Sequence, residues 1–251
     1  MQSATTLFEQ EKYFDAITEA KRLIFFDTLN TYSFRAYSLI AESYKKGGKL
    51  RDALLYFAQA SKYASTTGEK FNNKTSAIRI HILNRSITIA LRQIDEMSNQ
   101  PEFTPYTSGL AYWRGWAFMF ADRWYEASEE FNSIDSTLYL KNFCLDVDNK
   151  KYSVTFARTI SYFLPGAGQV YTGEYLNGIL SFGWNLLSGY LTISALKDER
   201  VFDGVALLSL LWMRFYTGNI SNAEKFAKEK NLEMSNSALN YLQLNYKGLK
   251  P

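Results

Sequence analysis

The chain offers few side chains for catalysis. Its only histidine is His81 and its only cysteine is Cys144. One cysteine rules out an internal disulfide, and one histidine rules out most metal sites and every Ser-His-Asp arrangement except one built on it. His81 lies between two isoleucines in a segment of helical period, where a packed histidine is far commoner than a catalytic base. Cys144, between two apolar residues, is expected to be a small core residue.

The other candidates for chemistry are Glu174, Asp203 and Arg214. Asp203 and Arg214 lie eleven positions apart in an apolar segment, nearly on one face of a helix. Ionisable groups at membrane depth suggest lipid or substrate handling. The more ordinary interpretation places the two near opposite ends of an anchoring helix, where long side chains reach water. An enzyme using His81, Glu174 or Asp203 is the weakest hypothesis, so we predict no catalytic site, no cofactor, no metal and no small-molecule substrate.

Composition favours an all-helical protein that does not bind nucleic acid. Lysine and arginine total 28 against 25 acidic residues, a net charge of +3 spread in ones and twos rather than in a basic stripe. The mean hydropathy of −0.24 excludes a polytopic transporter. Only four prolines occur in 251 residues, which fits long helices with few breaks. These features predict an all-α fold.

The elements that must position these residues begin with helical repeats. The clearest unit runs from Phe34 to about Tyr63 as helix, turn and helix, and its order of large and small residues resembles the tetratricopeptide pattern. Small residues are needed where antiparallel helices approach, and large ones fill the space between successive hairpins. The matching positions are Tyr37, Ile40, Ala41 and Tyr44, the turn Gly47-Gly48-Lys49-Leu50, and Ala53, Phe57 and Ala60.

Two further units and a degenerate one extend this pattern over residues 1–145. A second unit has Asp122-Arg123-Trp124 as its turn, and a third begins with Tyr13-Phe14-Asp15-Ala16, so the minimum of three repeats is met. The second unit matches at Gly115, Ala117, Phe118, Ala127 and Phe131. Asn72 to Met97 is helical by period but lacks a legible turn, and its expected core is Ile78, Ile82, Ile89 and Leu91. The proline-bearing segment Ser98 to Thr107 is expected to be a loop.

The C-terminal part predicts an interfacial helix and a helical hairpin. An apolar stripe over Val154 to Leu164 suits a helix at a membrane interface, within a linker at 146–165. Leu176 to Leu196 carries no charge over 21 residues, roughly 31 Å of helix, which is enough to cross a bilayer. Val201 to Thr217 is the expected second arm. The first arm has a polar face that must pack on protein: Asn177, Ser181, Asn185, Ser188 and Thr192. Composition alone leaves buried helices of a soluble domain almost equally plausible.

Two strings in this part resemble the signature of a known membrane module. Pro165 to Gly178 reads PGAGQVYTGEYLNG, and Tyr216 to Ala223 reads YTGNISNA. They are similar to the opening and close of a two-helix module in bacterial tetratricopeptide-repeat membrane proteins, over about Ser161 to Asn231. The resemblance implies a module at 166–231 and a tail at 232–251. Its motif residues would be Pro165, Gly166, Gly168, Gln169, Tyr171, Gly173, Gly178, Asp203, Arg214, Gly218 and Asn219.

The same resemblance implies an envelope protein and transfers no catalytic residue. Met1 to Thr6 has neither a cationic region nor an apolar core, and family members commonly begin with a signal peptide. We therefore expect a membrane-associated protein of the bacterial envelope, with the repeats on the periplasmic side after signal removal.

Together these features predict a membrane-anchored scaffold that binds a protein partner through its helical repeats and contacts lipid through its hairpin. Helical repeats form extended grooves suited to peptides or helices. The residues expected to contact the partner are Tyr37, Tyr44, Arg79, Trp113 and Arg114. Packing between repeats is the more ordinary role for Trp113, Trp116 and Trp124. The alternatives are a hairpin-centred role in lipid or membrane-protein handling, and a soluble all-α interaction protein whose apolar helices are core.

Overall fold

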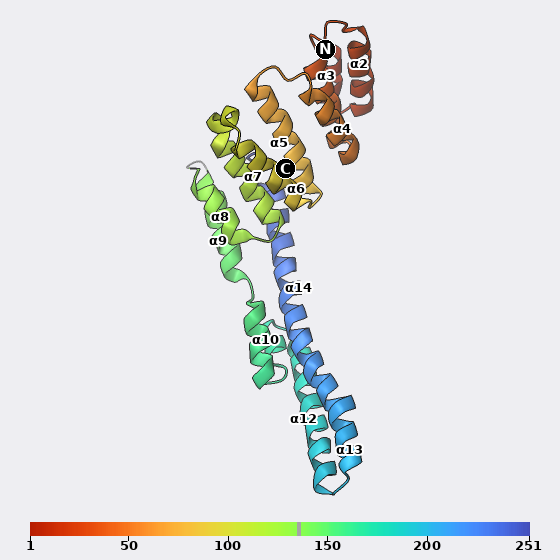
Figure 1. Ribbon diagram of the computed structural model, residues 1–251, viewed down its shortest axis with the longest axis vertical. Coiled ribbons are helices and arrows are strands. Elements are labelled where there is room, and N and C mark those ends of the chain that lie inside the picture. The colour runs from red at the N-terminus through yellow and green to blue at the C-terminus, as the bar shows by residue number, and fades with distance from the viewer. Residues whose placement is uncertain (135–136) are drawn as a thin grey trace. The chain divides into compact units, whose positions relative to one another are not determined.

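The computed structural model describes residues 1–134 and 137–251 and is built from helices (Figure 1). Helix accounts for 82% of the chain, and the described residues contain no strand. The prediction of an all-α fold is confirmed. The chain forms two compact units, the first comprising Met1–Leu145 together with Tyr246–Pro251 and the second comprising Asp146–Asn245.

In the first unit each helix packs on the next one along the chain, from α1 to α8. The helices are α1 Gln2–Glu9, α2 Tyr13–Phe26, α3 Ser33–Lys46, α4 Leu50–Ser61, α5 Thr67–Leu83, α6 Ile87–Ser98, the 3₁₀ helix η1 Pro101–Tyr106, α7 Thr107–Phe120, α8 Trp124–Asn132 and α9 Leu138–Lys150. Helices α3 and α4 flank the Gly47-Gly48 turn as expected, whereas Pro101–Tyr106 is a short helix rather than an open loop.

The turn that the sequence does not reveal lies at Asn84–Ser86, between α5 and α6. Arg85 adopts a left-handed backbone with φ of 54°. Left-handed turn positions are usually glycine or asparagine, so an arginine there gives no recognisable signal. The start of α5 is marked instead by a capping box, in which Thr66 accepts from the Glu69 backbone and the Glu69 side chain accepts from that of Thr66.

Small residues bring the helices of this unit close together. A Cβ on Gly115 of α7 would lie 2.6 Å from the Phe131 ring of α8, so the contact between these helices requires glycine. Ile78 and Ile82 are fully buried, as expected. The expectation for Ile89 is wrong, because α6 buries Ala90, Ile94 and Met97 and leaves Ile89 37% exposed on the neighbouring face.

The second unit contains α10 Val154–Phe163, α11 Ala167–Tyr171, α12 Tyr175–Lys197, α13 Val201–Ala206, the π-helix η3 Leu207–Trp212 and α14 Met213–Asn245. Helix α12 packs along α13, η3 and α14, while α10 and α11 pack on α14. Within the described residues, α12 alone is long and apolar enough to cross a membrane by length and composition. The chain after Asn231 is not a tail throughout, since α14 continues to Asn245 with Asn231, Ser235, Ala238 and Leu242 buried at helical spacing.

Candidate functional site

The signature residues of the second unit meet at one buried side chain, Asn219 of α14. Its Oδ1 accepts hydrogen bonds from the Gly166 backbone N–H at 2.7 Å, from Gln169 Nε2 at 3.1 Å and from Ser181 Oγ at 2.9 Å. Its Nδ2 donates to the Ser161 carbonyl oxygen at 3.0 Å. One amide thus joins the end of α10, the glycine turn, α11 and α12.

The chemistry of its partners fixes how this amide is oriented. The Gly166 N–H is a donor only and the Ser161 carbonyl is an acceptor only, so exchanging the oxygen and nitrogen of Asn219 would lose both bonds. The Ser161 carbonyl has no donor within its own helix, because the residue four positions on is Pro165. Asn219 therefore satisfies a backbone group that the proline leaves unpaired.

Glycines allow the backbone segments around Asn219 to approach one another. Gly166 has φ of +91°, and a Cβ there would collide with the Gly178 carbonyl of α12. A Cβ on Gly168 would lie 2.5 Å from the Ala223 methyl of α14. The Gly168 N–H donates to Ser161 Oγ at 3.0 Å. The expected motif glycines at 166, 168 and 178 thus have a steric reason, whereas Gly218 has open space where a Cβ would lie.

Other motif residues lie outside this network. The Tyr171 hydroxyl accepts from the Ser153 N–H at 3.1 Å, and Gly173 has φ of +83° in the turn before α12. Pro165 follows Leu164, whose backbone is extended, as a residue before proline prefers. Asp203 forms an exposed ion pair with Arg200 at 3.7 Å. Arg214 lines a cavity of about 250 Å³ together with Gln169, Asn185 and Asn219.

In the first unit, Arg79 and Trp113, two of the residues expected to contact a partner, lie together in one site. The Arg79 guanidinium lies over the Trp113 ring at 5.0 Å. Arg79 Nη2 donates to the Lys250 carbonyl oxygen at 2.7 Å. Burial lowers the pKa of Arg79. The Arg79 cation and the Trp113 ring thus lie together, next to residues 246–251 of the same chain.

Sequence reasoning missed the rest of this site. The Tyr112 hydroxyl bonds to the Leu249 carbonyl oxygen and lies 3.3 Å from the Tyr246 hydroxyl. The Tyr246 ring stacks on Tyr139 with a centroid separation of 6.2 Å and lies 6.1 Å from Trp116. Burial is the main reason why the pKa of Tyr112 is raised. Nothing in the spacing of residues 246–251 indicates that they return to the first unit.

Tyr37 and Tyr44 of α3 lie in a separate row of tyrosine rings with Tyr56 of α4 and with Tyr63, which follows α4. Tyr37 stacks on Tyr63 at 5.5 Å, and Tyr44 stacks on Tyr56 at 5.3 Å. Next to Tyr44, burial lowers the pKa of Lys45 to about 8, and the positive charge of Arg79 acts in the same direction. Arg79 therefore lies close enough to this row for its charge to affect the pKa of Lys45.

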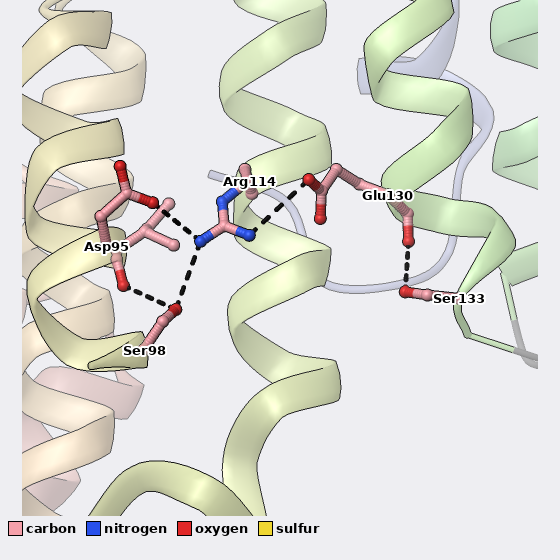
Figure 2. Close-up of polar contacts among 6 residues, drawn as sticks. Asp95, Ser98, Arg114, Glu130 and Ser133 are labelled. Carbon is pink, nitrogen blue, oxygen red and sulfur yellow. Dashed lines mark hydrogen bonds and ion pairs between the residues drawn. The ribbon is translucent and has the colours of Figure 1, made fainter. Parts of the chain in front are cut away.

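Arg114 is engaged in links between helices (Figure 2). Its guanidinium reaches Asp95 at 2.9 Å and Ser98 at 3.2 Å on α6, and Glu130 at 3.7 Å on α8. Burial raises the pKa of Glu130, and Arg114 opposes that shift. Of the predicted contact residues, Arg114 has the most evident packing role.

His81 lines a cavity of about 450 Å³ formed by α4, α5 and α6, and burial lowers its pKa. Asn73 also lines this cavity, and its Nδ2 donates to the Phe57 carbonyl at 2.8 Å and to Ser61 Oγ at 2.6 Å. Among the described residues, no group of histidine, cysteine, aspartate and glutamate side chains is arranged to hold a metal ion.

Comparison of the chain with protein-family models, with curated proteins and with solved structures found no match. The resemblance to bacterial tetratricopeptide-repeat membrane proteins therefore stays a prediction based on the two strings and the repeat spacing.

Proposed function

We propose that this chain is a non-enzymatic, membrane-anchored scaffold of the bacterial envelope. Its first unit is a tetratricopeptide-type solenoid that binds a protein partner, and α12 with α13, η3 and α14 is a membrane hairpin. The observation that carries the proposal is the inverted polarity of α12.

Helix α12 buries its polar residues and exposes its apolar ones. Asn185, Ser188 and Thr192 are 5%, 0% and 2% exposed, whereas Ile179 and Leu186 are 67% and 63% exposed. The exposed apolar surface continues on the second arm with Phe202 and Leu210. Contiguous apolar surface of this kind is typical of a membrane or partner interface. Polar residues between helices are typical of membrane bundles.

The hydrogen bonds of these polar side chains also suit an apolar surrounding. Asn185 Nδ2 donates to the Ser181 carbonyl at 2.8 Å, Ser188 Oγ donates to the Trp184 carbonyl, and Thr192 Oγ1 donates to the Ser188 carbonyl at 2.8 Å. Each of these donors finds an acceptor inside the helix itself, whereas Asn185 Oδ1 is buried without a hydrogen-bond partner among the described residues. A helix in hydrocarbon has to satisfy its polar groups in this way, because lipid offers no partner.

The solenoid is supported by the packing of the first unit. Successive helices contact mainly their neighbours, and close crossings carry small side chains such as Ala36, Ala53 and Ala60, all fully buried. Stacks built from nearest-neighbour contacts present long surfaces and seldom carry out chemistry. A partner-binding role follows. A pull-down from detergent-solubilised envelope that recovers no reproducible partner would contradict it.

The membrane anchor can be tested by flotation of protein synthesised in the presence of phospholipid vesicles. Leu186→Lys places a charge near the middle of α12, at a cost of about 3 kcal/mol for insertion, and we expect it to reduce the floating fraction severalfold. Leu55→Lys is the matched control, because Leu55 of α4 is similarly exposed at 59%. Wild-type protein that stays at the bottom of the gradient, or a Leu186→Lys variant that floats like wild type, would contradict the anchor.

A second candidate is lipid handling by the hairpin, which the cavity beside Arg214 favours. A cation among amide side chains in about 250 Å³ could hold an anionic headgroup. Arg214→Ala and Asp203→Ala should then impair the cellular phenotype while the protein stays in the membrane. If both variants keep membrane association and phenotype unchanged, this candidate fails.

A further inference from the structure

The chain's own residues Tyr246–Pro251 lie against the first unit in a non-helical conformation. Their partners define what we term the aromatic groove, which is formed by residues of α5, α7 and the start of α9. The groove residues are Arg79, Tyr112, Trp113, Trp116 and Tyr139. The groove is thus occupied by a non-helical segment of the same chain, which bends at Gly248.

The hydrogen bonds that hold this segment use features that any extended peptide offers. Arg79 and Tyr112 donate to two successive backbone carbonyls, those of Lys250 and Leu249. The Tyr246 side chain adds a specific contact, because its ring lies against Trp116 and Tyr139. A non-helical segment from another protein could make the same contacts if it carried an aromatic residue at this place.

The segment leaves part of the groove unfilled. A cavity of about 400 Å³ remains, with Tyr246 and Leu249 on one side and Phe71, Gly109, Trp113 and Ile134 among its other walls. Leu249 borders this cavity and is still 67% exposed. A larger apolar side chain at its position would bury more surface, at roughly 25 cal/mol per Å².

We propose that the aromatic groove is a binding site for a non-helical segment of a protein partner, and that Tyr246–Pro251 occupies it until that partner displaces it. The preferred segment carries an aromatic residue and, three positions later, a bulky apolar residue that enters the cavity. This inference rests on the proposed partner-binding role of the first unit and names its site and ligand class.

Residues 246–251 are covalently attached to the protein that they bind, so they compete strongly with a free peptide. A short flexible link holds a ligand at an effective concentration of about 1 mM, so a free peptide with a dissociation constant of about 50 μM should bind the intact chain about 20-fold more weakly than a chain with an empty groove. The comparison of the two chains separates competition for the groove from binding elsewhere on the protein.

The experiment uses a fluorescein-labelled peptide of the sequence YKGLKP, residues 246–251, and measures anisotropy with detergent-solubilised protein. The receptors are the full chain, a chain ending at Asn245, and the full chain with Tyr246→Ala. We expect saturable binding of similar affinity to the shortened chain and to the Tyr246→Ala chain, and binding at least 10-fold weaker to the full chain. A peptide with phenylalanine in place of leucine should bind more tightly, and one with alanine in place of tyrosine should not bind.

Substitutions in the groove complete the test. In the shortened chain, Arg79→Gln should weaken peptide binding severalfold, whereas Arg92→Gln on the exposed face of α6 should not. Circular dichroism establishes that each variant is folded, and Tyr246→Ala provides the test in a full-length chain if shortening unfolds it. Equal affinity of the full and emptied chains, or no saturable binding to either emptied chain, overturns the inference. If the peptide experiment fails but the pull-down still recovers a partner, only the proposed groove is refuted. If the pull-down also recovers no partner, the partner-binding role of the first unit is refuted as well.

Discussion

Replacing Asn219 with leucine should destabilise the second unit strongly, because two buried backbone groups depend on this side chain. The Gly166 N–H and the Ser161 carbonyl each bond to the Asn219 amide, and the proline at 165 removes the usual helical donor for Ser161. The other two donors to the Asn219 oxygen, on Gln169 and Ser181, can bond to other acceptors. Gln169 Nε2 also bonds to the Asn219 backbone carbonyl at 3.0 Å, and the Ser181 hydroxyl can rotate.

The expected magnitude follows from these two orphaned groups. An unsatisfied buried donor or acceptor costs about 1–3 kcal/mol, so Asn219→Leu should lower the free energy of unfolding by about 2–6 kcal/mol. Asn219→Asp should not rescue it, because a second oxygen would face the Ser161 carbonyl and a charge would be buried. The control is Asn222→Leu, one turn away and exposed, which should change stability by less than about 0.5 kcal/mol.

The assay is reversible unfolding in mixed micelles of a mild detergent and dodecyl sulfate, followed by circular dichroism. A loss for Asn219→Leu that equals the loss for Asn222→Leu would refute the reasoning, since it would mean that the two backbone groups find other partners. A similar loss for Asn219→Asp and Asn219→Leu would support the role of the Nδ2 donor.

Three further predictions concern packing and charge. Gly168→Ala should destabilise the second unit, because the new methyl group would collide with Ala223. The control is Gly183→Ala on α12, where a methyl group has open space and should be neutral or slightly stabilising. Equal melting temperatures of the two variants would contradict this prediction. Arg114→Met should cost more stability at pH 7 than at pH 4. Burial raises the pKa of Glu130, so the stability that this carboxyl group contributes at low pH is lost as pH rises through its pKa in the folded protein. Without Arg114 the pKa of Glu130 should rise further, which makes the loss of stability at pH 7 larger. Denaturant titrations that give the same loss of stability at pH 4 and pH 7 would contradict this prediction. Lys45 should titrate with a pKa of about 8 in ¹³C-detected NMR. Between about pH 8 and 10 the unfolded chain therefore binds more protons at Lys45 than the folded chain does. The free energy of unfolding should rise over this range in wild type, and less so in Lys45→Gln.

Composition and periodicity were sufficient to predict an all-helical chain, but not the division of residues 72–97 into two helices or the helix at Pro101–Tyr106. The Gly47-Gly48 turn could be recognised because glycine has a distinctive backbone, whereas the turn at Arg85 could not. The resemblance implied a tail after Asn231, whereas α14 continues to Asn245 and buries the polar residues Asn231 and Ser235. Among the predicted buried positions of α12, Asn177 is exposed and bonds to Glu174 at 3.0 Å instead.

The candidate sites were predictable only as separate residues. The signature glycines, Gln169 and Asn219 could be selected by resemblance, but their convergence on one amide depends on how α10 and α14 pack, which is not a local property. Ser161 was missed, and Ser181 was predicted only to lie on the packed polar face of the first arm, because a serine in a helix carries no sign of a distant partner. Arg79 and Trp113 were selected without Tyr112 or residues 246–251, since contacts across more than 130 positions leave no trace in spacing.

The central claim is that α12 and the second arm hold this protein in a membrane. Carbonate extraction of cell membranes, combined with protease treatment of intact and opened vesicles, tests it directly. The account predicts that the full chain stays in the membrane pellet and that protease removes the first unit from one side only, leaving a protected fragment that contains α12. Release of the chain into the soluble fraction, or digestion of α12 together with the first unit, would contradict it.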